Sequence, residues 1–401
     1  MIILSIETSC DETAVSIVEA NGGLKSPTFS VLGNALFSQI DIHKEYGGVF
    51  PMVAKREHAK KLPILLKETL KETQMFISYD ISYEMNIWEE FKNITSREEG
   101  LYENFRKLFE NVEKPKIDVI SVTAGPGLVP ALWVGVSFAT ALGKLWSIPV
   151  VGANHMEGHI ASVLLDGSDG DKNNVIRFPA LALLISGGHT ELVEIKGWGK
   201  YNIIGETRDD AVGEAFDKVA RMLELPYPGG PHISAMADMA REKNLPHIAK
   251  LPRPMIHSDD FDFSFAGLKT AVLYYLRDHP DFDKSDVARE FEDAVTEVLL
   301  KKTKKALEQT GAKTLIIAGG VIANKKLREV FTRLSTEYED LAVKIPERSL
   351  TGDNAIMIAY ATYIHVSAYP ELLKGEEKII ANGNLRLNPG SKAWRATGLT
   401  T

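Results

Sequence analysis

The sequence has 401 residues, of which 44% are hydrophobic and 25% charged, the balance of a globular protein with two or three domains. Its formal net charge of −8 argues against a dedicated nucleic-acid-binding protein, and its single cysteine, Cys10, excludes an intramolecular disulfide. No apolar run reaches the roughly 18 residues that a membrane span needs. We therefore expect no membrane association and a cytoplasmic protein.

Strand-like segments follow the same layout in each half of the chain. The first half has them at residues 2–8, 13–19, 31–38 and 117–123. The second half has them at residues 180–186, 190–195, 201–206 and 314–318. In both halves the last strand leads through a glycine turn into a helix, an arrangement that can present a helix N-terminus to a phosphate. The repeat indicates an internal duplication of α/β halves with a ligand cleft between them.

Four further helices are predicted by their apolar period and by their flanking Pro and Gly residues, at residues 53–73, 209–224, 284–310 and 352–369. Residues of about 74–116 show no sustained period, which predicts an inserted, partly helical decoration that is peripheral to catalysis. The predicted domains are an N-terminal lobe at residues 1–150 with this insertion, a C-terminal lobe at residues 151–380, and an irregular tail at residues 381–401.

The sharpest local signal is the segment His155-Met-Glu-Gly-His159. On a helix, positions i and i+4 share one face, so two imidazoles could bind one metal ion. Two half-buried histidines without a metal fit the pattern equally well. A zinc endopeptidase needs its glutamate directly after the first histidine. Here Glu157 is displaced to the far side of the helix, which disfavours that activity.

Three other segments carry possible chemistry, each with an ordinary structural alternative. Leu184–Thr190 holds a Gly-Gly turn that could cradle an anion or be a plain hairpin. Asp210, Glu214 and Asp217 fall at i, i+4 and i+7, a stripe that could bind ligand or be a solvated helix face. Asp353 precedes a helix, where capping is the default explanation for an aspartate.

Eight stretches in this order resemble the TsaD family, also called Gcp or YgjD, relatives of the KEOPS catalytic subunit. The resemblance covers nearly the whole chain except about 74–116 and the tail. The stretches are Ile6–Thr13, Thr123–Gly127, Asn154–His159, Leu184–Thr190, Asp210–Lys218 with Pro228–Pro231, Phe263–Lys269, Gly319–Arg328 and Asp353–Ile358.

The resemblance implies an α/β, actin/Hsp70/sugar-kinase-like fold with two duplicated lobes and an interlobe cleft. It implies a tRNA N6-adenosine threonylcarbamoyltransferase that takes threonylcarbamoyl-AMP, modifies N6 of adenosine 37 in tRNAs reading codons that begin with adenine, and releases AMP. It also implies a TsaB-like paralogue and a TsaE-like ATPase as partners, with tRNA as the substrate.

The same resemblance implies roles for particular residues. His155, His159 and Asp353 are expected to bind one divalent metal ion, with Fe²⁺ ahead of Zn²⁺, and Asp11 is expected near the reaction centre as the catalytic residue. Since Asp353 follows the histidines far along the chain, we expect it to tie the two lobes across the cleft. The expected substrate-binding residues are Leu184, Ile185, Ser186, Gly187, Gly188, Asp217, Gly230 and Asn324.

One departure from the family pattern bears on substrate binding. Ser234 stands four residues after Gly230, where some relatives place an acid that grips the ribose, so that contact is expected to be weaker or absent. No residue has the setting of a covalent nucleophile. A nucleotide-binding scaffold with a structural metal is the alternative outside the enzymes.

Overall fold

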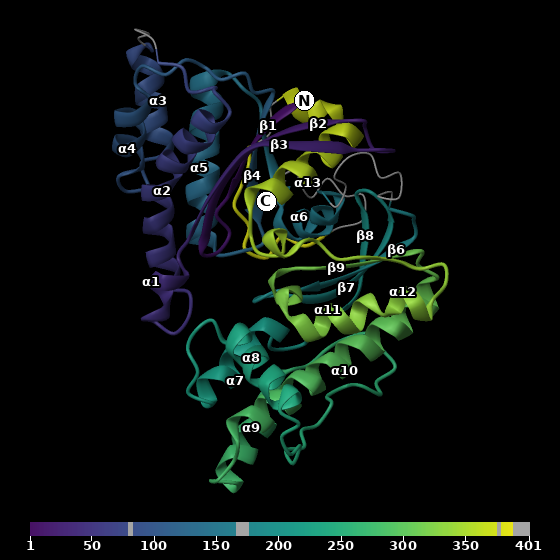
Figure 1. The fold of residues 1–401 in the computed structure, drawn as a ribbon. Coiled ribbons are helices and arrows are strands. Elements are labelled where there is room, and N and C mark those ends of the chain that lie inside the picture. Colours follow the sequence, from purple (N-terminus) through teal and green to yellow (C-terminus); the bar gives the residue numbers. More distant parts are fainter. Residues whose placement is uncertain (79–82, 166–175, 375–377, 388–401) are drawn as a thin grey trace, which may run out of the picture. The chain divides into compact units, whose positions relative to one another are not determined.

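The computed structural model describes residues 1–78, 83–165, 176–374 and 378–387 (Figure 1). The chain forms two compact units: unit 1 is Met1–Gly167 with Asp353–Thr401, and unit 2 is Ser168–Gly352. This division differs from the sequence-based one at residues 150 and 380. The difference arises because the chain stays in unit 1 through the first helix after residue 150 and returns to it at Asp353.

A five-stranded mixed sheet forms the centre of unit 1, in the order β3-β2-β1-β4-β5. The first three strands are antiparallel neighbours, whereas β1, β4 and β5 run parallel. Every residue of β4 and all of β1 after Ile2 are buried, so both faces of the sheet are covered. The strands are β1 (Ile2–Glu7), β2 (Glu12–Asn21), β3 (Thr28–Ser38), β4 (Val119–Gly125) and β5 (Val150–Asn154).

Helices cover the two faces of this sheet. The long helices α2 and α5 pack on one face, and α13 packs on the other against β1, β2 and β5 (Figure 1). The Ser5 hydroxyl on β1 donates a buried hydrogen bond to the Ala355 carbonyl, which fixes the start of α13 on the sheet. The helices of unit 1 are α1 (Ile40–Lys44), α2 (Pro51–Glu72), α3 (Met85–Ile94), α4 (Leu101–Phe109), α5 (Val129–Trp146), α6 (His155–Ala161) and α13 (Ala355–Ala368).

The sheet of unit 2 repeats the topology of the first. Its order is β10-β9-β6-β7-β8, with β6, β7 and β8 antiparallel neighbours and β6, β9 and β10 parallel. In both units the first strand thus lies between the second and the fourth, which confirms the duplicated α/β fold of actin/Hsp70/sugar-kinase type. The strands are β6 (Ala180–Ile185), β7 (Thr190–Gly197), β8 (Lys200–Glu206), β9 (Thr314–Ala318) and β10 (Ala342–Lys344).

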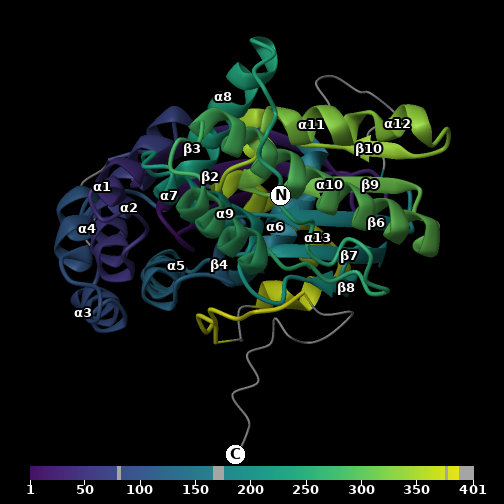
Figure 2. The same ribbon diagram turned by 90° about the horizontal axis from the view of Figure 1, so that it is seen from below.

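The 27-residue helix α10 packs on this second sheet and against α8 (Figure 2). Its apolar residues, among them Phe291 and Val295, join the core cluster of unit 2. Asp283 caps its start and Gly311 ends it in the left-handed conformation. The helices of unit 2 are α7 (Val212–Met222), α8 (Gly229–Glu242), α9 (Ala266–Asp278), α10 (Lys284–Thr310), α11 (Lys325–Thr332) and α12 (Leu334–Glu337).

The region expected to be a peripheral insertion is well packed. It contains α3 and α4, as its partly helical character predicted, but Phe91, Phe105 and Phe109 are all buried. Phe105 stacks on both other rings at centroid distances of 4.6 and 4.5 Å and meets Phe138 of α5 edge-on. These rings belong to the main core cluster of unit 1. Packing against α2 and α5 therefore makes this region part of the fold.

Two remaining expectations concern a membrane span and the tail. Among the described residues, α5 alone is long and apolar enough to cross a membrane, and 72% of it is buried in the structure, which makes it weak evidence for a span. The described part of the tail packs on unit 1: Asn382 N–H donates to the Ala124 carbonyl at 2.8 Å. Residues 388–401 lie outside the described residues.

Candidate metal centre and substrate-binding residues

The two histidines of the H-x-x-x-H segment lie on α6, directly after β5. Asn154 caps this helix, because its side-chain oxygen accepts from the backbone N–H of Met156 and Glu157. The rings of His155 and His159 meet edge to face, with their centroids 4.7 Å apart and their planes at 85°. The predicted helical pairing of the two imidazoles is therefore confirmed.

Asp353 completes a cluster with the two histidines. Its Oδ1 lies 3.3 Å from the Nε2 atom of His155 and 3.3 Å from that of His159. The three ligand atoms lie within 4.8 Å of one another, a spacing that could hold a metal ion. Two imidazoles and one carboxylate also leave coordination positions open, as a catalytic site requires.

A second layer of side chains orients His155. Glu7, at the end of β1, places its Oε2 3.1 Å from His155 Nδ1, and the Ser9 hydroxyl lies 3.2 Å from the same nitrogen. The Thr123 hydroxyl donates to Glu7 at 2.6 Å and holds the carboxylate in place. With Nδ1 engaged, Nε2 is directed at Asp353. This carboxylate–imidazole arrangement is the usual support of a metal-binding histidine.

His159 provides an independent test of whether a metal fits. The ring is fully buried, yet within the described residues neither nitrogen has an aligned hydrogen-bond partner. Its Nε2 approaches Asp353 at 3.3 Å without the geometry of a hydrogen bond. A buried nitrogen without a partner is costly, and a metal ion bound at Nε2 would satisfy that nitrogen. The donor set therefore fits a divalent cation.

The charges of the cluster support this assignment. Burial opposes a charge on His155, but Asp353 and Glu7 outweigh it and raise the pKa of this histidine well above its usual value. Burial also opposes ionisation of Asp353, but His155 outweighs it and lowers the pKa of the carboxyl. Burial lowers the pKa of His159. A cation bound here takes the place of the His155 proton.

Asp353 reaches the histidines from within unit 1, because α13 packs on the sheet of that unit. The expectation that Asp353 ties the two lobes together is therefore wrong. Its alternative role as a helix cap is also excluded. The cap of α13 is Asn354, whose side-chain oxygen accepts from the Met357 N–H at 3.0 Å.

Glu157 lies away from the cluster, as its helical position predicted. It is fully buried and bonds to Nε2 of His365 on α13. A buried carboxylate held by another side chain cannot activate a water beside His155. The structure thus removes the feature on which peptidase chemistry depends.

The predicted catalytic residue, Asp11, lies in the turn between β1 and β2 and is buried at 8% exposure. Burial, Asp11 and Asp353 together raise the pKa of the neighbouring Glu12 well above its usual value. Burial and the same two aspartates raise the pKa of the Cys10 thiol. The turn therefore lies within electrostatic reach of the metal centre, in one unit with it.

The glycine turn of unit 2 joins β6 to β7. Ser186 N–H donates to the His189 carbonyl at 2.9 Å, so the turn is the hairpin that the sequence left open. Gly187 and Gly188 are exposed, and a Cβ on either would meet nothing within 4 Å. Leu184 and Ile185 are fully buried strand residues. Any ligand contact from those two would have to come from the backbone.

The predicted acidic stripe does not form, because α7 begins only at Val212. Asp210 lies before the helix and is paired with Lys218 and Lys269 at 2.7 and 3.0 Å. Asp217 is on the helix and accepts from the Gly229 N–H at 2.7 Å.

Gly229 and Gly230 are the first two residues of α8. A Cβ on Gly229 would lie 2.8 Å from Asp217 Cα, so glycine is needed for this close approach of α7 and α8. Gly230 has open space at its Cα.

Asn324 caps α11 by accepting from the Leu327 N–H, and its amide donates to Glu292 at 2.6 Å. Glu292 is fully buried and also pairs with Arg241. Burial raises the pKa of Glu292, against hydrogen bonds that include one from Ser234. Ser234 and Asn324 thus share one buried carboxylate, which sequence reasoning did not foresee.

Comparison with known proteins decides the family. The family described as "TsaD: tRNA N6-adenosine threonylcarbamoyltransferase" matches residues 30–81 and 99–360. Curated proteins with the same name are 40% identical over 93% of this chain and 94% of theirs, in Herminiimonas arsenicoxydans, and 41% identical over 92% of both, in Aromatoleum aromaticum. The chain belongs to the tRNA N6-adenosine threonylcarbamoyltransferase family. It is thus a member of a family of transferases.

The family match also redefines the insertion. Residues 82–98 fall outside the matched ranges, a shorter stretch than the 74–116 expected from composition. Helix α3 begins and ends within this stretch, whereas α4 belongs to the matched part. The unmatched stretch therefore contains one amphipathic helix, whose Trp88 and Phe91 are buried in unit 1.

Solved structures of other families are more distant. A HypF structure with bound phosphate and nucleotide has a TM-score of 0.48 and 12% identity, covering 90% of this chain and 46% of HypF. A 2-hydroxyisocaproyl-CoA dehydratase activator from Clostridium difficile has a TM-score of 0.44 and 10% identity, covering 92% and 97% of the two chains. These scores are low, so the fold class rests on the strand order of the two sheets.

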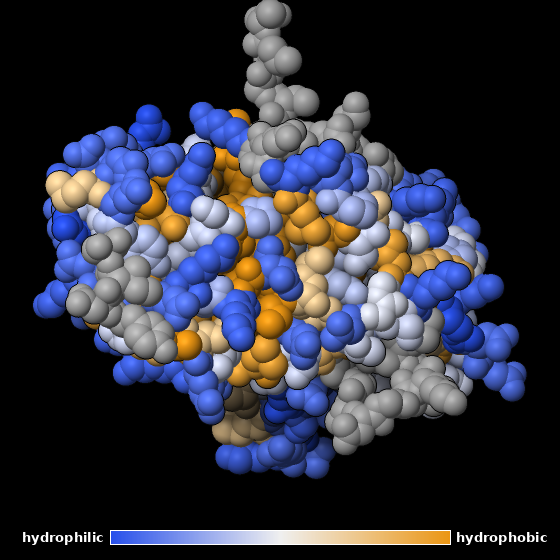
Figure 3. Space-filling view, turned by 90° about the horizontal axis from the view of Figure 1, so that it is seen from above, coloured by the Kyte–Doolittle hydropathy of each residue, from blue (hydrophilic) through white to orange (hydrophobic). Residues whose placement is uncertain are grey.

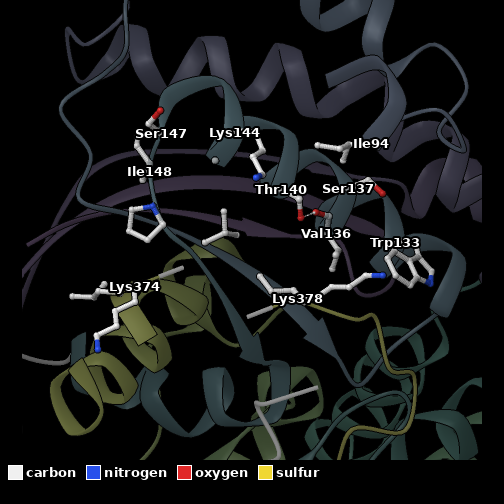
Figure 4. Close-up of a pocket in the computed structure, with 15 residues that line it drawn as sticks. Ile94, Trp133, Val136, Ser137, Thr140, Lys144, Ser147, Ile148, Lys374 and Lys378 are labelled. Atoms are coloured by element: carbon white, nitrogen blue, oxygen red, sulfur yellow. Dashed lines mark hydrogen bonds between the residues drawn. The ribbon is translucent and has the colours of Figure 1, made fainter. Parts of the chain in front are cut away.

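A cavity of about 700 Å³ lies apart from the metal centre (Figure 4). It opens at the end of α5 and the beginning of β5, where Lys144, Ser147 and Val150 line it, whereas His155 follows the other end of β5. Trp133 and Lys378 point into the same space.

Figure 3 shows a band of hydrophobic surface on the upper face of the molecule, bordered by hydrophilic residues.

Proposed function

We propose that this protein transfers the threonylcarbamoyl group from threonylcarbamoyl-AMP to N6 of adenosine 37 in tRNAs that read codons beginning with adenine, with release of AMP, in the cytoplasm. The observation that carries the proposal is the buried cluster of His155, His159 and Asp353, oriented by Glu7, in a chain of this family. Acyl transfer needs a polarised carbonyl, and this cluster provides the ligands for a Lewis acid.

The roles of the unit 1 residues follow from their contacts. His155, His159 and Asp353 hold a divalent ion, Fe²⁺ ahead of Zn²⁺, which when bound polarises the acyl oxygen. Glu7 and Ser9 keep His155 in the orientation that directs Nε2 at the site. Asp11 accepts the proton that the adenosine N6 loses as the new bond forms. No covalent step on the protein is needed, since N6 attacks the activated carbonyl directly.

Unit 2 is assigned the adenylate part of the substrate. The exposed backbone of Gly187 and Gly188, next to the half-buried Ser186, suits the phosphate, because glycines let amide groups approach an anion closely. Asp217, Gly230 and Asn324 then hold the nucleoside, while Leu184 and Ile185 contribute backbone only. The shared contact of Ser234 and Asn324 with Glu292 keeps a carboxylate in this region although Ser234 replaces an acid.

The direct test is nucleoside analysis of unmodified tRNA after incubation with threonylcarbamoyl-AMP and the metal-loaded protein. A TsaB-like paralogue and a TsaE-like ATPase are added in parallel reactions, since the proposal includes them as partners. Threonylcarbamoyladenosine in the tRNA together with free AMP is the expected result. A nucleotide-binding scaffold would give neither product under any of these conditions, and that result would overturn the proposal.

A further inference from the structure

His58 is a fully buried side chain of α2 that bonds to the turn between β1 and β2. Its Nε2 lies 2.9 Å from the Cys10 backbone oxygen, and its Nδ1 lies 2.8 Å from the Thr13 hydroxyl. Because a carbonyl oxygen only accepts, the proton must sit on Nε2, and Nδ1 accepts from Thr13. These two partners fix both the orientation and the tautomer of the ring.

The ring is neutral under ordinary conditions. Burial lowers the pKa of His58 to about 4, against the smaller opposing effect of the Cys10 carbonyl. The titratable groups that act on it are Glu7, His43 and Glu57. A second donor, the Gln39 side-chain amide, approaches Nδ1 at 3.3 Å. The Cys10 carbonyl, Glu7 and Glu57 favour the charged ring, but burial outweighs them, so the imidazole is neutral and donates only through Nε2.

Three elements hold the turn, each through a different carbonyl. The Ser9 carbonyl accepts from the Leu128 N–H at 2.7 Å, and the Asp11 carbonyl accepts from the Gln39 N–H at 3.0 Å. The Cys10 carbonyl between them accepts from His58. Only this central contact comes from a side chain, so a single substitution can remove it and leave the two outer contacts in place.

The turn carries two groups that serve the reaction centre. The Ser9 hydroxyl contacts the metal-facing His155, and Asp11 is the proposed proton acceptor. We propose that His58 is a positioning residue for the transfer reaction: by holding the Cys10 carbonyl, it fixes Asp11 and Ser9 beside the metal centre. This inference rests on the proposed function, which gives Asp11 its role.

The structure offers a matched control for the packing of α2. Leu62 lies one helical turn after His58, is fully buried and belongs to the core of unit 1. It has no polar group with which to hold the turn. Loss of its side chain therefore weakens the helix packing while it spares the Cys10 contact. Cys10 is the sole cysteine of the chain and a half-buried residue, so the rate at which its thiol is labelled reports on opening of the turn.

The test compares His58→Phe, His58→Gln and Leu62→Ala with the wild type, each as the metal-loaded full chain. In His58→Phe, kcat for transfer should fall by about 10- to 100-fold, the scale expected for a misplaced catalytic group, while KM and metal content stay within about twofold of wild type. In His58→Gln the amide nitrogen can donate to the Cys10 carbonyl and should restore most of the rate. Leu62→Ala should keep kcat.

Thiol labelling of Cys10 gives a second readout that needs no activity. His58→Phe should label about tenfold faster than wild type, because a lost hydrogen bond of about 1.4 kcal/mol eases local opening of the turn. His58→Gln and Leu62→Ala should label at the wild-type rate. If the wild type itself forms no modified nucleoside, the proposed function fails, and the labelling rates still decide whether His58 holds the turn.

Two results would overturn the inference. One is a folded His58→Phe protein with wild-type kcat and wild-type labelling. The other is equal loss of kcat in His58→Phe and Leu62→Ala, which would assign the effect of His58 to general packing of α2.

Discussion

The turns that follow the first strand of each sheet occupy equivalent places in the two units, but their side chains differ completely. The β1–β2 turn of unit 1 is bounded by the buried carboxylates Glu7 and Asp11 and is held from three elements. The β6–β7 turn of unit 2 has two exposed glycines with open space around them. One topology thus carries a rigid polar turn in the first unit and an open backbone turn in the second.

This difference shows what the duplication determines. Strand order places a turn at the end of each central strand. The residues of the turn and of the strand end decide whether the turn orients metal-binding side chains or exposes its own backbone amides. Glu7 ends β1 with a carboxylate that orients a histidine, whereas the equivalent end of β6 is the buried Ile185. The turn of unit 1 is therefore suited to supporting side chains, and the turn of unit 2 to offering backbone amides.

The largest expected effect concerns the stability of unit 1. Phe105→Ala should lower the free energy of unfolding by about 3–5 kcal/mol, since it removes a fully buried ring stacked on two others. Phe291→Ala in unit 2 is the matched control, because Phe291 is equally buried. Heating with a metal-sensitive dye should show early metal release in Phe105→Ala alone. Metal release at the same temperature in both variants would show that destabilising unit 1 affects metal binding no more than destabilising unit 2.

A second effect depends on pH through His58. Its folded pKa of about 4 lies below the ordinary 6.5, so between these values the unfolded chain binds a proton that the folded chain excludes. The contribution of His58 to the free energy of unfolding is therefore fully present above pH 6.5. It falls as the pH drops toward 4, by at most about 3 kcal/mol. His58→Gln should lose less stability than wild type between pH 7 and 4.5 in urea unfolding. Identical losses would contradict the neutral buried ring.

Glu7→Gln tests the polar turn of unit 1 through the metal. The variant keeps the size of the side chain but loses the charge that faces His155 Nδ1. We expect metal affinity to fall by about 10- to 100-fold, the usual effect of removing a supporting carboxylate. Glu194→Gln on β7 of unit 2 should leave affinity unchanged. Equal affinities in both variants, measured by competition with a chelator, would remove Glu7 from the centre.

The smallest expected effect concerns adenylate binding in unit 2. Asp217→Asn retains an oxygen that can accept from the Gly229 N–H and so preserves the start of α8. The lost charge should weaken AMP binding by about 1 kcal/mol, roughly fivefold, by calorimetry. Metal content should stay at the wild-type value, since Asp217 belongs to the other unit. An unchanged AMP affinity would sink the assignment of Asp217.

Local patterns in the sequence were sufficient for most of the fold. Apolar runs and glycine turns placed eight of the ten strands in the described part of the chain within a few residues, whereas the short β5 and β10 were not predicted. The period of 3.6 residues brought His155 and His159 together. These features depend on neighbours along the chain, which a sequence displays directly. The same period failed at Asp210, because the helix starts at Val212, three residues later than the predicted start at residue 209.

Long-range partners could not be predicted in the same way. Nothing near Asp353 in the sequence shows that α13 returns to the first sheet, since a buried apolar helix fits either unit. His58 and Glu7 were missed because their partners lie 48 and 148 residues away along the chain. A carboxylate at the end of an otherwise apolar strand was the one available signal for Glu7. The packing of α3 and α4 was also missed, because their apolar stripes are short.

The central claim is that unit 1 alone builds the metal centre on which transfer depends, and Asp353→Asn tests it most directly. Helix α13 should survive this change, because Asn354 provides the cap. Metal content and nucleoside analysis are measured on the same preparation. The account predicts that bound metal and threonylcarbamoyladenosine formation fall together by more than about 100-fold, with the fold intact. Full metal occupancy with wild-type transfer activity in Asp353→Asn would contradict it.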